Sequence, residues 1–187
     1  MTGTVGTVGT SGTVAGRTAR AASIVADALE ILETEGREGL TMRRLAEAVG
    51  IRAPSLYKHF PDKAAVELIL IEQWFTEAAI AFEQAFARDG ATLATFVTTY
   101  RAFALAHPHL YRLMTAGPLP RHLLTPGVEE RAAAQLLKVL PDPDMARAAF
   151  AFAHGMTMLE LDGRFPPDAD VDAAWQAGAQ AFRLASR

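Results

Sequence analysis

The chain has 187 residues and half of them are hydrophobic, so its composition supports a folded protein with a well-buried core, in one domain or two small ones. It contains no cysteine, which excludes disulfides, thiolate metal sites and cysteine nucleophiles and suits a reducing cytoplasm. No apolar run approaches the roughly 20 residues of a membrane span, and the N-terminus lacks the pattern of a signal peptide. We therefore expect a cytoplasmic protein that makes no contact with a membrane.

The net charge of −3 is unevenly distributed along the chain. Up to Lys63 there are eight Lys and Arg against seven Asp and Glu, whereas the rest of the chain is acidic. A nucleic-acid site depends on which face carries the basic groups rather than on the total charge. The charge alone therefore neither supports nor excludes binding to DNA.

Residues 1–16 repeat Gly, Thr and Val almost without charge, which predicts a flexible, low-complexity arm. Arg17 and Arg20 follow directly, so the arm is either an inert tail or ends in a basic tip that contacts a phosphate or the minor groove. From about Arg17 to Glu35 the apolar residues recur at helical spacing, and Gly36 is expected to end this amphipathic helix.

Two short helices are predicted next, with a glycine between them. Thr41 is a good N-cap for a helix of barely two turns, which Gly50 stops. Pro54 fits the first turn of the second helix, because the N–H that proline lacks would be unpaired there, and this helix is expected to run to about His59. The apolar or small residues expected to lock the pair together are Leu45, Ala46, Ile51, Leu56 and Phe60.

The rest of the chain is helical throughout by its periodicity, and prolines or glycines separate most of the segments. Asp62 is the expected N-cap of a long helix from Lys63 to about Arg88, and further helices are predicted over residues 92–106, 108–115, 126–140, 143–162 and 170–185. No segment alternates with the period of a strand. The predicted class is all-α with about nine helices, divided into an N-terminal three-helix unit over residues 17–62 and a C-terminal helical unit over residues 63–187.

The short helix pair carries the polar side chains that a DNA-reading helix-turn-helix needs. In such a motif the first helix crosses the DNA backbone, and the second places its N-terminal residues against base edges in the major groove. Hydroxyls, cations and helix N-terminal amides can converge here on phosphates. The candidate DNA-binding residues are Thr41, Arg43, Arg44, Arg52, Ala53, Pro54, Ser55, Tyr57, Lys58, His59 and Lys63.

Some of these residues also have a purely structural interpretation. Tyr57 could be a core aromatic residue, and His59 could pack and form hydrogen bonds within the protein. Arg44 could belong, with Glu47, to a solvated helix face.

The segment GLTMRRLAEAVGIRAPSLYKHFPDKAAV resembles the DNA-binding region of the TetR family of transcriptional regulators, over about residues 20–68. The residues that carry the resemblance are Gly39, Leu40, Thr41, Ala46, Gly50, Ile51, Leu56, Tyr57, His59, Phe60 and Lys63. The resemblance implies a homodimeric regulator, usually a repressor, without a cofactor. Such a regulator binds double-stranded operator DNA and releases it when a small-molecule effector binds the C-terminal domain.

The resemblance also implies a division of roles by position. Residues matching backbone-contacting positions are Thr41, Tyr57 and Lys63, and those matching positions that can face bases are Arg43, Ala53, Pro54 and Lys58. Arg52 departs from the pattern, because many members have a serine there that caps the recognition helix. Either that helix is less stable at its start, or Arg52 contacts a phosphate or a guanine.

The C-terminal unit, with His154-Gly155, is similar to one subfamily of C-terminal domains of these regulators, which implies no particular ligand. The candidate effector pocket is apolar and aromatic, which suits a hydrophobic small molecule. Its expected lining is Phe96, Tyr100, Phe103, Tyr111, Met114, Phe150, His154 and Met158. Any helical core would contain the same residue types, so each of them could also be an ordinary core residue.

Small residues in the last two predicted helices, residues 145–161 and 171–184, allow close helix packing and predict a four-helix dimer interface. The alternative is that both helices only complete the core of one chain. His107 and His109 are spaced i, i+2 and lack a carboxylate cluster, so no metal site is expected.

No catalytic set converges in the sequence, and an enzyme is not expected. The acids of the long helix, Glu67, Glu72, Glu77 and Glu83, are interpreted as a solvated face. Two alternatives to a DNA-binding regulator remain at this point. The chain could be a helical interaction module that keeps the fold without binding DNA, or a helical-bundle enzyme.

Overall fold

The structure is a computed structural model that describes residues 19–185. The predicted N-terminal arm and Arg17 lie outside the described residues. Within them the fold is all-α, without strands, as the periodicity of the sequence predicts. The elements are α1 (Ala19–Gly39), α2 (Met42–Val49), α3 (Ala53–Leu56), α4 (Lys63–Asp89), α5 (Leu93–Ala106), α6 (Pro108–Thr115), the short 3-10 helix η2 (Arg121–Leu123), α7 (Val128–Val139), α8 (Pro143–Leu161) and α9 (Val171–Ala185).

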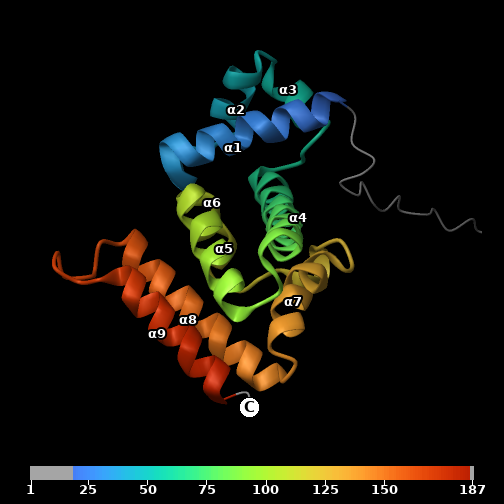
Figure 1. Cartoon of the computed structure of the whole chain (residues 1–187). Coiled ribbons are helices and arrows are strands. Elements are labelled where there is room, and N and C mark those ends of the chain that lie inside the picture. Colours follow the sequence, from blue (N-terminus) through green and yellow to red (C-terminus); the bar gives the residue numbers. More distant parts are fainter. Residues whose placement is uncertain (1–18, 186–187) are drawn as a thin grey trace, which may run out of the picture.

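Helices α1 to α3 form a small unit at one end of the molecule, and α4 leads from it into the larger bundle of α5 to α9 (Figure 1). The apolar stripe of α1 is buried as its spacing predicts, and α1 packs against α2, α4 and α6. Gly36 interrupts the helical backbone of α1 with a φ of 73°, a conformation that glycine adopts without strain. None of the helices in the described range is both long and apolar enough to cross a membrane.

The turn between α2 and α3 has the geometry that the sequence predicts. Thr41 caps α2, because its hydroxyl oxygen accepts a hydrogen bond from the backbone N–H of Arg44 at 3.1 Å. Gly50 is left-handed with a φ of 68°, and its N–H bonds back into the end of α2. The chain therefore reverses within a few residues and brings α3 across α2.

Helix α3 is shorter than predicted and ends at Leu56 rather than near His59. The N–H groups of His59 and Phe60 both donate to the carbonyl of Leu56, at 2.9 and 3.0 Å. Residues 57–59 therefore form a turn and do not extend the helix. Pro61 disfavours a helical conformation at Phe60, and Phe60 is buried. The chain therefore leaves the helix early and enters α4, where Asp62 caps Ala65 as predicted.

The interpretation of the α4 acids as a solvated face is wrong for two of the four, whereas Glu77 and Glu83 are partly exposed. Glu67 and Glu72 are buried, with 9% and 4% of their surfaces exposed. Glu67 accepts two hydrogen bonds of 2.9 Å from Arg37 of α1, and Glu72 accepts one of 2.6 Å from the backbone N–H of Thr125. These carboxylates tie α4 to its neighbours, because a charge is buried in a protein only where it is paired.

A further carboxylate, on α1, joins the two units of the fold. Glu33 of α1 accepts hydrogen bonds from the backbone N–H groups of His109 and Leu110, at 3.2 and 2.9 Å, in the first turn of α6. These are N–H groups that have no partner within their own helix, and an anion is favoured near them. The N-terminal unit is thus attached to the bundle through α6 as well as through α4.

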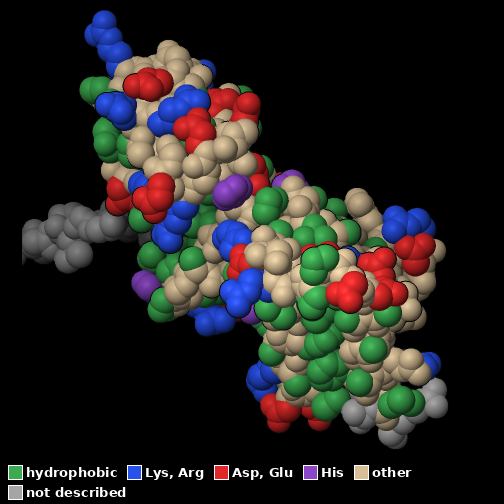
Figure 2. Space-filling model, turned by 90° about the vertical axis from the view of Figure 1, so that its left-hand side faces the viewer, with side chains coloured by type: hydrophobic (Ala, Val, Ile, Leu, Met, Phe, Trp, Pro, Cys, Tyr) green, Lys and Arg blue, Asp and Glu red, His purple; other side chains and the backbone are tan. Residues whose placement is uncertain are grey.

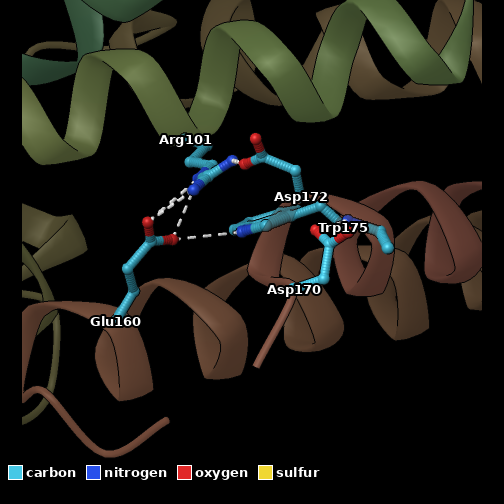
Figure 3. A network of polar contacts seen from close by, with 6 residues as sticks. Arg101, Glu160, Asp170, Asp172 and Trp175 are labelled. Carbon is cyan, nitrogen blue, oxygen red and sulfur yellow. Dashed lines mark hydrogen bonds and ion pairs between the residues drawn. The ribbon is translucent and has the colours of Figure 1, made fainter. Parts of the chain in front are cut away.

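Helices α8 and α9 form a hairpin that is fastened to α5 by a polar network (Figure 3). Arg101 of α5 lies 2.6 Å from Glu160 of α8 and also pairs with Asp172 of α9. The indole N–H of Trp175 donates to the same Glu160 at 3.2 Å. The close approach within the hairpin needs Gly178, since a Cβ there would lie 2.0 Å from the ring of Phe152.

Candidate functional site

The end of the molecule formed by α2 and α3 presents cationic side chains to solvent. The side chain of Arg43 is 89% exposed, and its nearest acid, Glu47, lies 3.8 Å away. Arg52 and Lys58 are exposed and make no ion pair with any described residue. Figure 2 shows Lys and Arg side chains projecting from this end of the molecule. Unpaired cations on one surface are suited to phosphate binding.

Buried residues hold this surface in shape from behind. Leu45, Leu56 and Phe60 are almost completely buried, and each lies within two residues of exposed candidates. Tyr57, beside Leu56, is 50% exposed, so it is not a core aromatic residue. The candidates that also face solvent are Thr41, Pro54, Ser55 and His59, while Ala53 is partly buried.

Arg52 occupies the N-cap position of α3, where its side chain makes no capping hydrogen bond. This agrees with the prediction that arginine is a poor cap. The side chain is exposed at the end of a helix that approaches DNA in this motif, so it is available to a phosphate or a base.

Two candidate cations are bound within the protein instead. Arg44 pairs with Glu35 of α1 at 2.7 Å, and the hydrogen bond that Arg44 donates to Glu35 raises the pKa of Arg44. Lys63 donates to the carbonyl of Arg37 at 2.7 Å and lies 3.6 Å from Glu67. An ammonium has three N–H donors, so Lys63 keeps some capacity for a phosphate, but its charge is partly compensated.

A cavity of about 680 Å³ lies within the C-terminal bundle, between α4, α5, α7 and α8. Six of the eight predicted pocket residues line it: Phe96, Tyr100, Phe103, Met114, Phe150 and His154. Tyr111 is fully buried behind the wall, and Met158 packs against the core outside the lining. Volume and lining are those of a site for a drug-sized apolar ligand.

The sequence did not single out the contributions of α4 and α7 to this cavity. These are mostly apolar; Glu129 of α7 is an exception and pairs with Arg121 of η2 at 2.8 Å. The additional lining residues include Trp74, Phe75, Ala78, Phe82, Ala132, Ala133, Leu136 and Leu137. Their apolar spacing is visible in the sequence, but it does not say whether a stripe faces a core or a cavity.

The cavity wall contains a chain of polar groups. The hydroxyls of Tyr100 and Tyr111 are 2.9 Å apart, and the hydroxyl of Tyr111 lies 2.7 Å from Nδ1 of His154. Burial raises the pKa values of both tyrosines, so they stay protonated. Burial also lowers the pKa of His154, which favours the neutral imidazole. We refer to these three residues as the hydroxyl chain.

His107 and His109, which were considered as metal ligands, pack against other residues of the protein. The ring of His107 lies edge-on to Phe103, with centroids 5.5 Å apart, at the start of α6. His109 lies beside Gly36 of α1. In the described part of the chain, no three His, Asp or Glu residues are arranged to hold a metal ion.

The outer side of the α8–α9 hairpin is covered by small and apolar residues. They recur every three or four residues on each helix and are at least partly exposed. We call this surface the α8–α9 face; its residues are Ala148, Ala151, Gly155, Leu159, Ala173, Ala177, Ala181 and Leu184. Figure 2 shows hydrophobic side chains gathered over this lower part of the molecule.

An exposed cationic helix-turn-helix joined to a helical bundle is the arrangement of a DNA-binding transcriptional regulator. The chain matches the bacterial regulatory proteins of the tetR family over residues 24–67, and the tetracyclin repressor-like C-terminal domain over residues 93–182. The chain belongs to the TetR family, whose members are DNA-binding transcriptional regulators.

Similar proteins agree with this assignment. The chain is 33% identical over 169 residues to an uncharacterized helix-turn-helix-type transcriptional regulator of Mycobacterium tuberculosis, covering 82% of this chain and 75% of that protein. Over 54 residues it is 46% identical to the class C tetracycline repressor protein of Escherichia coli, covering 29% of this chain and 25% of that protein.

Solved structures share the whole fold. A protein with unknown function from Rhodococcus sp. RHA1 has a TM-score of 0.74 and 26% identity, covering 91% of this chain and 97% of that one. The TetR-Q116A variant from Acinetobacter baumannii, in complex with minocycline, has a TM-score of 0.60 and 24% identity. It covers 88% of this chain and 94% of that one.

Proposed function

We propose that this protein is a homodimeric repressor that binds a pseudo-palindromic operator and leaves it when a small apolar molecule enters the cavity. The observation that carries the proposal is the set of exposed cations on α2 and on either side of α3, of which Arg52 and Lys58 have no acidic partner among the described residues. A regulator of this kind acts on chromosomal DNA and so would work in the cytoplasm.

Contacts with the DNA backbone would come from the hydroxyl-bearing and flanking residues. The hydroxyl of Thr41 caps α2 with its oxygen and can still donate its proton to a phosphate. Tyr57 is exposed enough to donate its hydroxyl in the same way. Ser55, His59 and Lys63 would add weaker contacts, which position the protein without reading sequence.

Contacts with bases would come from the residues at the start of α3 and from Arg43. Ala53 and Pro54 offer only apolar surface, which favours the methyl group of a thymine. Arg43 and Lys58 can donate to a guanine. Arg44 is expected to contribute little, because Glu35 already neutralises it.

A second copy of the chain would bind through the α8–α9 face. Its small side chains allow two hairpins to approach closely and form a four-helix interface with twofold symmetry. One recognition helix of a single turn reads few base pairs, so two half-sites about 34 Å apart are needed for an affinity that discriminates sequences. Dimerisation is therefore part of the proposed DNA-binding function.

Release would follow from a ligand that binds better to a conformation in which the two recognition helices no longer match one turn of DNA. This proposal is supported by the path of α4, which lines the cavity with Trp74 and begins directly after the helix-turn-helix. The minocycline in the Acinetobacter structure shows a ligand bound by a protein of the same fold.

The test is binding of the full chain to the intergenic DNA upstream of its own gene, followed by fluorescence anisotropy at 50 and 200 mM salt. We expect binding that weakens roughly 10³-fold or more if six or more phosphates are contacted. A fragment of equal length and scrambled sequence is the control and should bind much more weakly. A well-folded dimer that treats both fragments alike, or binds neither, would contradict the proposal.

A further inference from the structure

The hydroxyl chain has a property that follows from counting its protons. Neutral imidazole carries one N–H, and each tyrosine carries one O–H, so the three residues bring three protons. The two contacts, Tyr100 to Tyr111 and Tyr111 to His154, use one proton each. One proton is therefore left over. If Tyr111 accepted from both neighbours, its own O–H would be buried without a partner, which is costly. Tyr111 therefore donates to one neighbour and accepts from the other, and the spare proton lies at one end of the chain or the other.

The two arrangements differ in which end of the chain keeps the spare proton. If Tyr100 donates to Tyr111 and Tyr111 donates to Nδ1, the free N–H is on Nε2 of His154 and the oxygen of Tyr100 can only accept. If Nδ1 donates to Tyr111 and Tyr111 donates to Tyr100, the free O–H is on Tyr100 and Nε2 can only accept. In both arrangements the ends of the chain offer one donor and one acceptor.

Both ends belong to residues that line the cavity, whereas Tyr111 in the middle is fully buried. Among the described residues, Tyr111 is the only hydrogen-bond partner of either end, so each end keeps hydrogen-bonding capacity for a molecule in the cavity. The Thr157 hydroxyl, one turn beyond His154 on α8, is close enough to influence Tyr111 but lacks hydrogen-bond geometry with any described group. It therefore does not take the place of either end.

The surroundings favour a ligand that is flat and uncharged. Phe96, Phe103 and Phe150 line the same cavity and provide aromatic faces and edges for a planar ring system. The cations that line it are paired with acids, Arg121 with Glu129 and Arg147 with Asp144. A charged ligand group beside the hydroxyl chain would be buried without a free counter-charge, which is costly.

We propose that the cavity recognises a neutral planar aromatic molecule with one group that both donates and accepts a hydrogen bond. Tyr100 and His154 would hold this group. This inference rests on the proposed effector role of the cavity. A carboxamide is such a group, because it carries its donor and its acceptor on separate atoms. Tyr111 sets the selectivity without touching the ligand, because it forces one end to accept whenever the other donates. A ligand with two acceptors and no donor leaves one end unsatisfied and is disfavoured.

Three probes of equal size and shape test this proposal. They are naphthalene-2-carboxamide, which donates and accepts; 2-nitronaphthalene, which only accepts; and 2-isopropenylnaphthalene, which does neither. Dissociation constants for the full-length protein are measured by equilibrium dialysis, and each comparison is made between protein variants for one probe. Differences in the water solubility of the probes therefore cancel.

Tyr100→Phe removes one end of the chain and leaves the cavity shape in place. We expect it to weaken the carboxamide about three- to tenfold and to leave the isopropenyl probe within about twofold. Tyr57→Phe, a change on the other unit of the fold, is the matched control and should alter neither. Equal losses for both probes, or no loss for the carboxamide, would overturn the proposal.

Tyr111→Phe uncouples the two ends, after which both Tyr100 and His154 can donate. The preference for the carboxamide over the nitro probe should then fall about fivefold or more, mainly because the nitro probe binds better. An unchanged preference in a folded Tyr111→Phe protein would show that the chain does not set selectivity. If none of the probes binds to the wild-type protein, the proposed ligand class is wrong.

The same probes separate this inference from the proposed function. Each is added to the protein bound to its upstream DNA, and release is followed by anisotropy. Binding of the carboxamide with the predicted variant pattern but without release would leave the ligand class standing and contradict the effector role. Release by the isopropenyl probe as readily as by the carboxamide, with no effect of Tyr100→Phe on either, would support the effector role and contradict the ligand class.

Discussion

The N-terminal unit and the C-terminal bundle both pack apolar helix faces, but the first supports a site on its surface and the second encloses a cavity. In the first, Leu45, Leu56 and Phe60 form a small core. This core fixes the backbone so that the neighbouring candidate DNA-binding side chains face solvent. In the second, the aromatic residues leave a space of about 680 Å³ that the protein does not fill itself. The comparison shows that a surface site depends on short-range sequence, whereas a cavity depends on how distant helices are placed.

The largest expected effect comes from the small core of the N-terminal unit. Leu56 is 0% exposed, so Leu56→Ala should lower the free energy of unfolding by about 2 to 5 kcal/mol and abolish DNA binding. Urea denaturation measures the first effect and anisotropy the second. Leu123→Ala is the control, because Leu123 is 57% exposed and its loss should cost less than about 0.5 kcal/mol.

The next effect concerns the α8–α9 face. A Cβ on Gly155 meets nothing within 4 Å in one chain, so Gly155→Leu should fold normally but keep two hairpins apart. We expect a monomer by analytical ultracentrifugation and a loss of about a hundredfold in DNA affinity, or about 2.7 kcal/mol. Ala87→Leu adds a leucine to the exposed side of α4 and should change neither. A Gly155→Leu protein that is still a dimer would place the interface elsewhere.

The third effect separates two neighbouring arginines. Arg43→Ala should cost about 1 to 3 kcal/mol on the preferred site and relax the preference at one base pair. Arg44→Ala should cost less, because Glu35 holds that side chain. Lys63→Ala should weaken binding to all sequences alike and reduce the salt dependence. Competition binding against single-base variants of the site measures all three, and equal losses for Arg43 and Arg44 would refute this division.

The smallest effect tests the wall of the cavity. Burial lowers the pKa of His154, so the unfolded chain binds its proton more readily than the native protein. The stability that the neutral imidazole contributes is present above pH 6.5 and is lost as the pH falls below this value. His154→Gln should therefore reduce the loss of stability between pH 7 and pH 5 in urea denaturation. His122→Gln, on the exposed η2 segment, should leave that loss unchanged.

Much of the fold could be predicted because its signals are local. Thr41, Gly50, Asp62 and the spacing of apolar residues mark helix ends and faces without reference to the rest of the chain. The end of α3 was placed too late, since the turn at Tyr57 to His59 is decided by the burial of Phe60 against the core. Helix boundaries set by such packing are not visible in the periodicity.

The candidate sites were less predictable, for a related reason. Charged residues look solvated in a sequence until a partner is known, and Glu67, Glu72 and Arg44 all have partners from other elements. The cavity likewise takes part of its wall from α4 and α7, whose apolar stripes could equally have filled a core. Tyr111 has the right chemistry for a pocket residue, but its position places it one layer behind the wall.

The central claim is that two chains, joined through the α8–α9 face, place two helix-turn-helix units on one DNA site. It is tested most directly by the mass of the complex with the upstream DNA, measured by sedimentation equilibrium. We predict two chains per DNA fragment for the wild-type protein and no stable complex at the same concentration for Gly155→Leu. A stable complex with one chain per fragment, or an unchanged complex with Gly155→Leu, would contradict the claim.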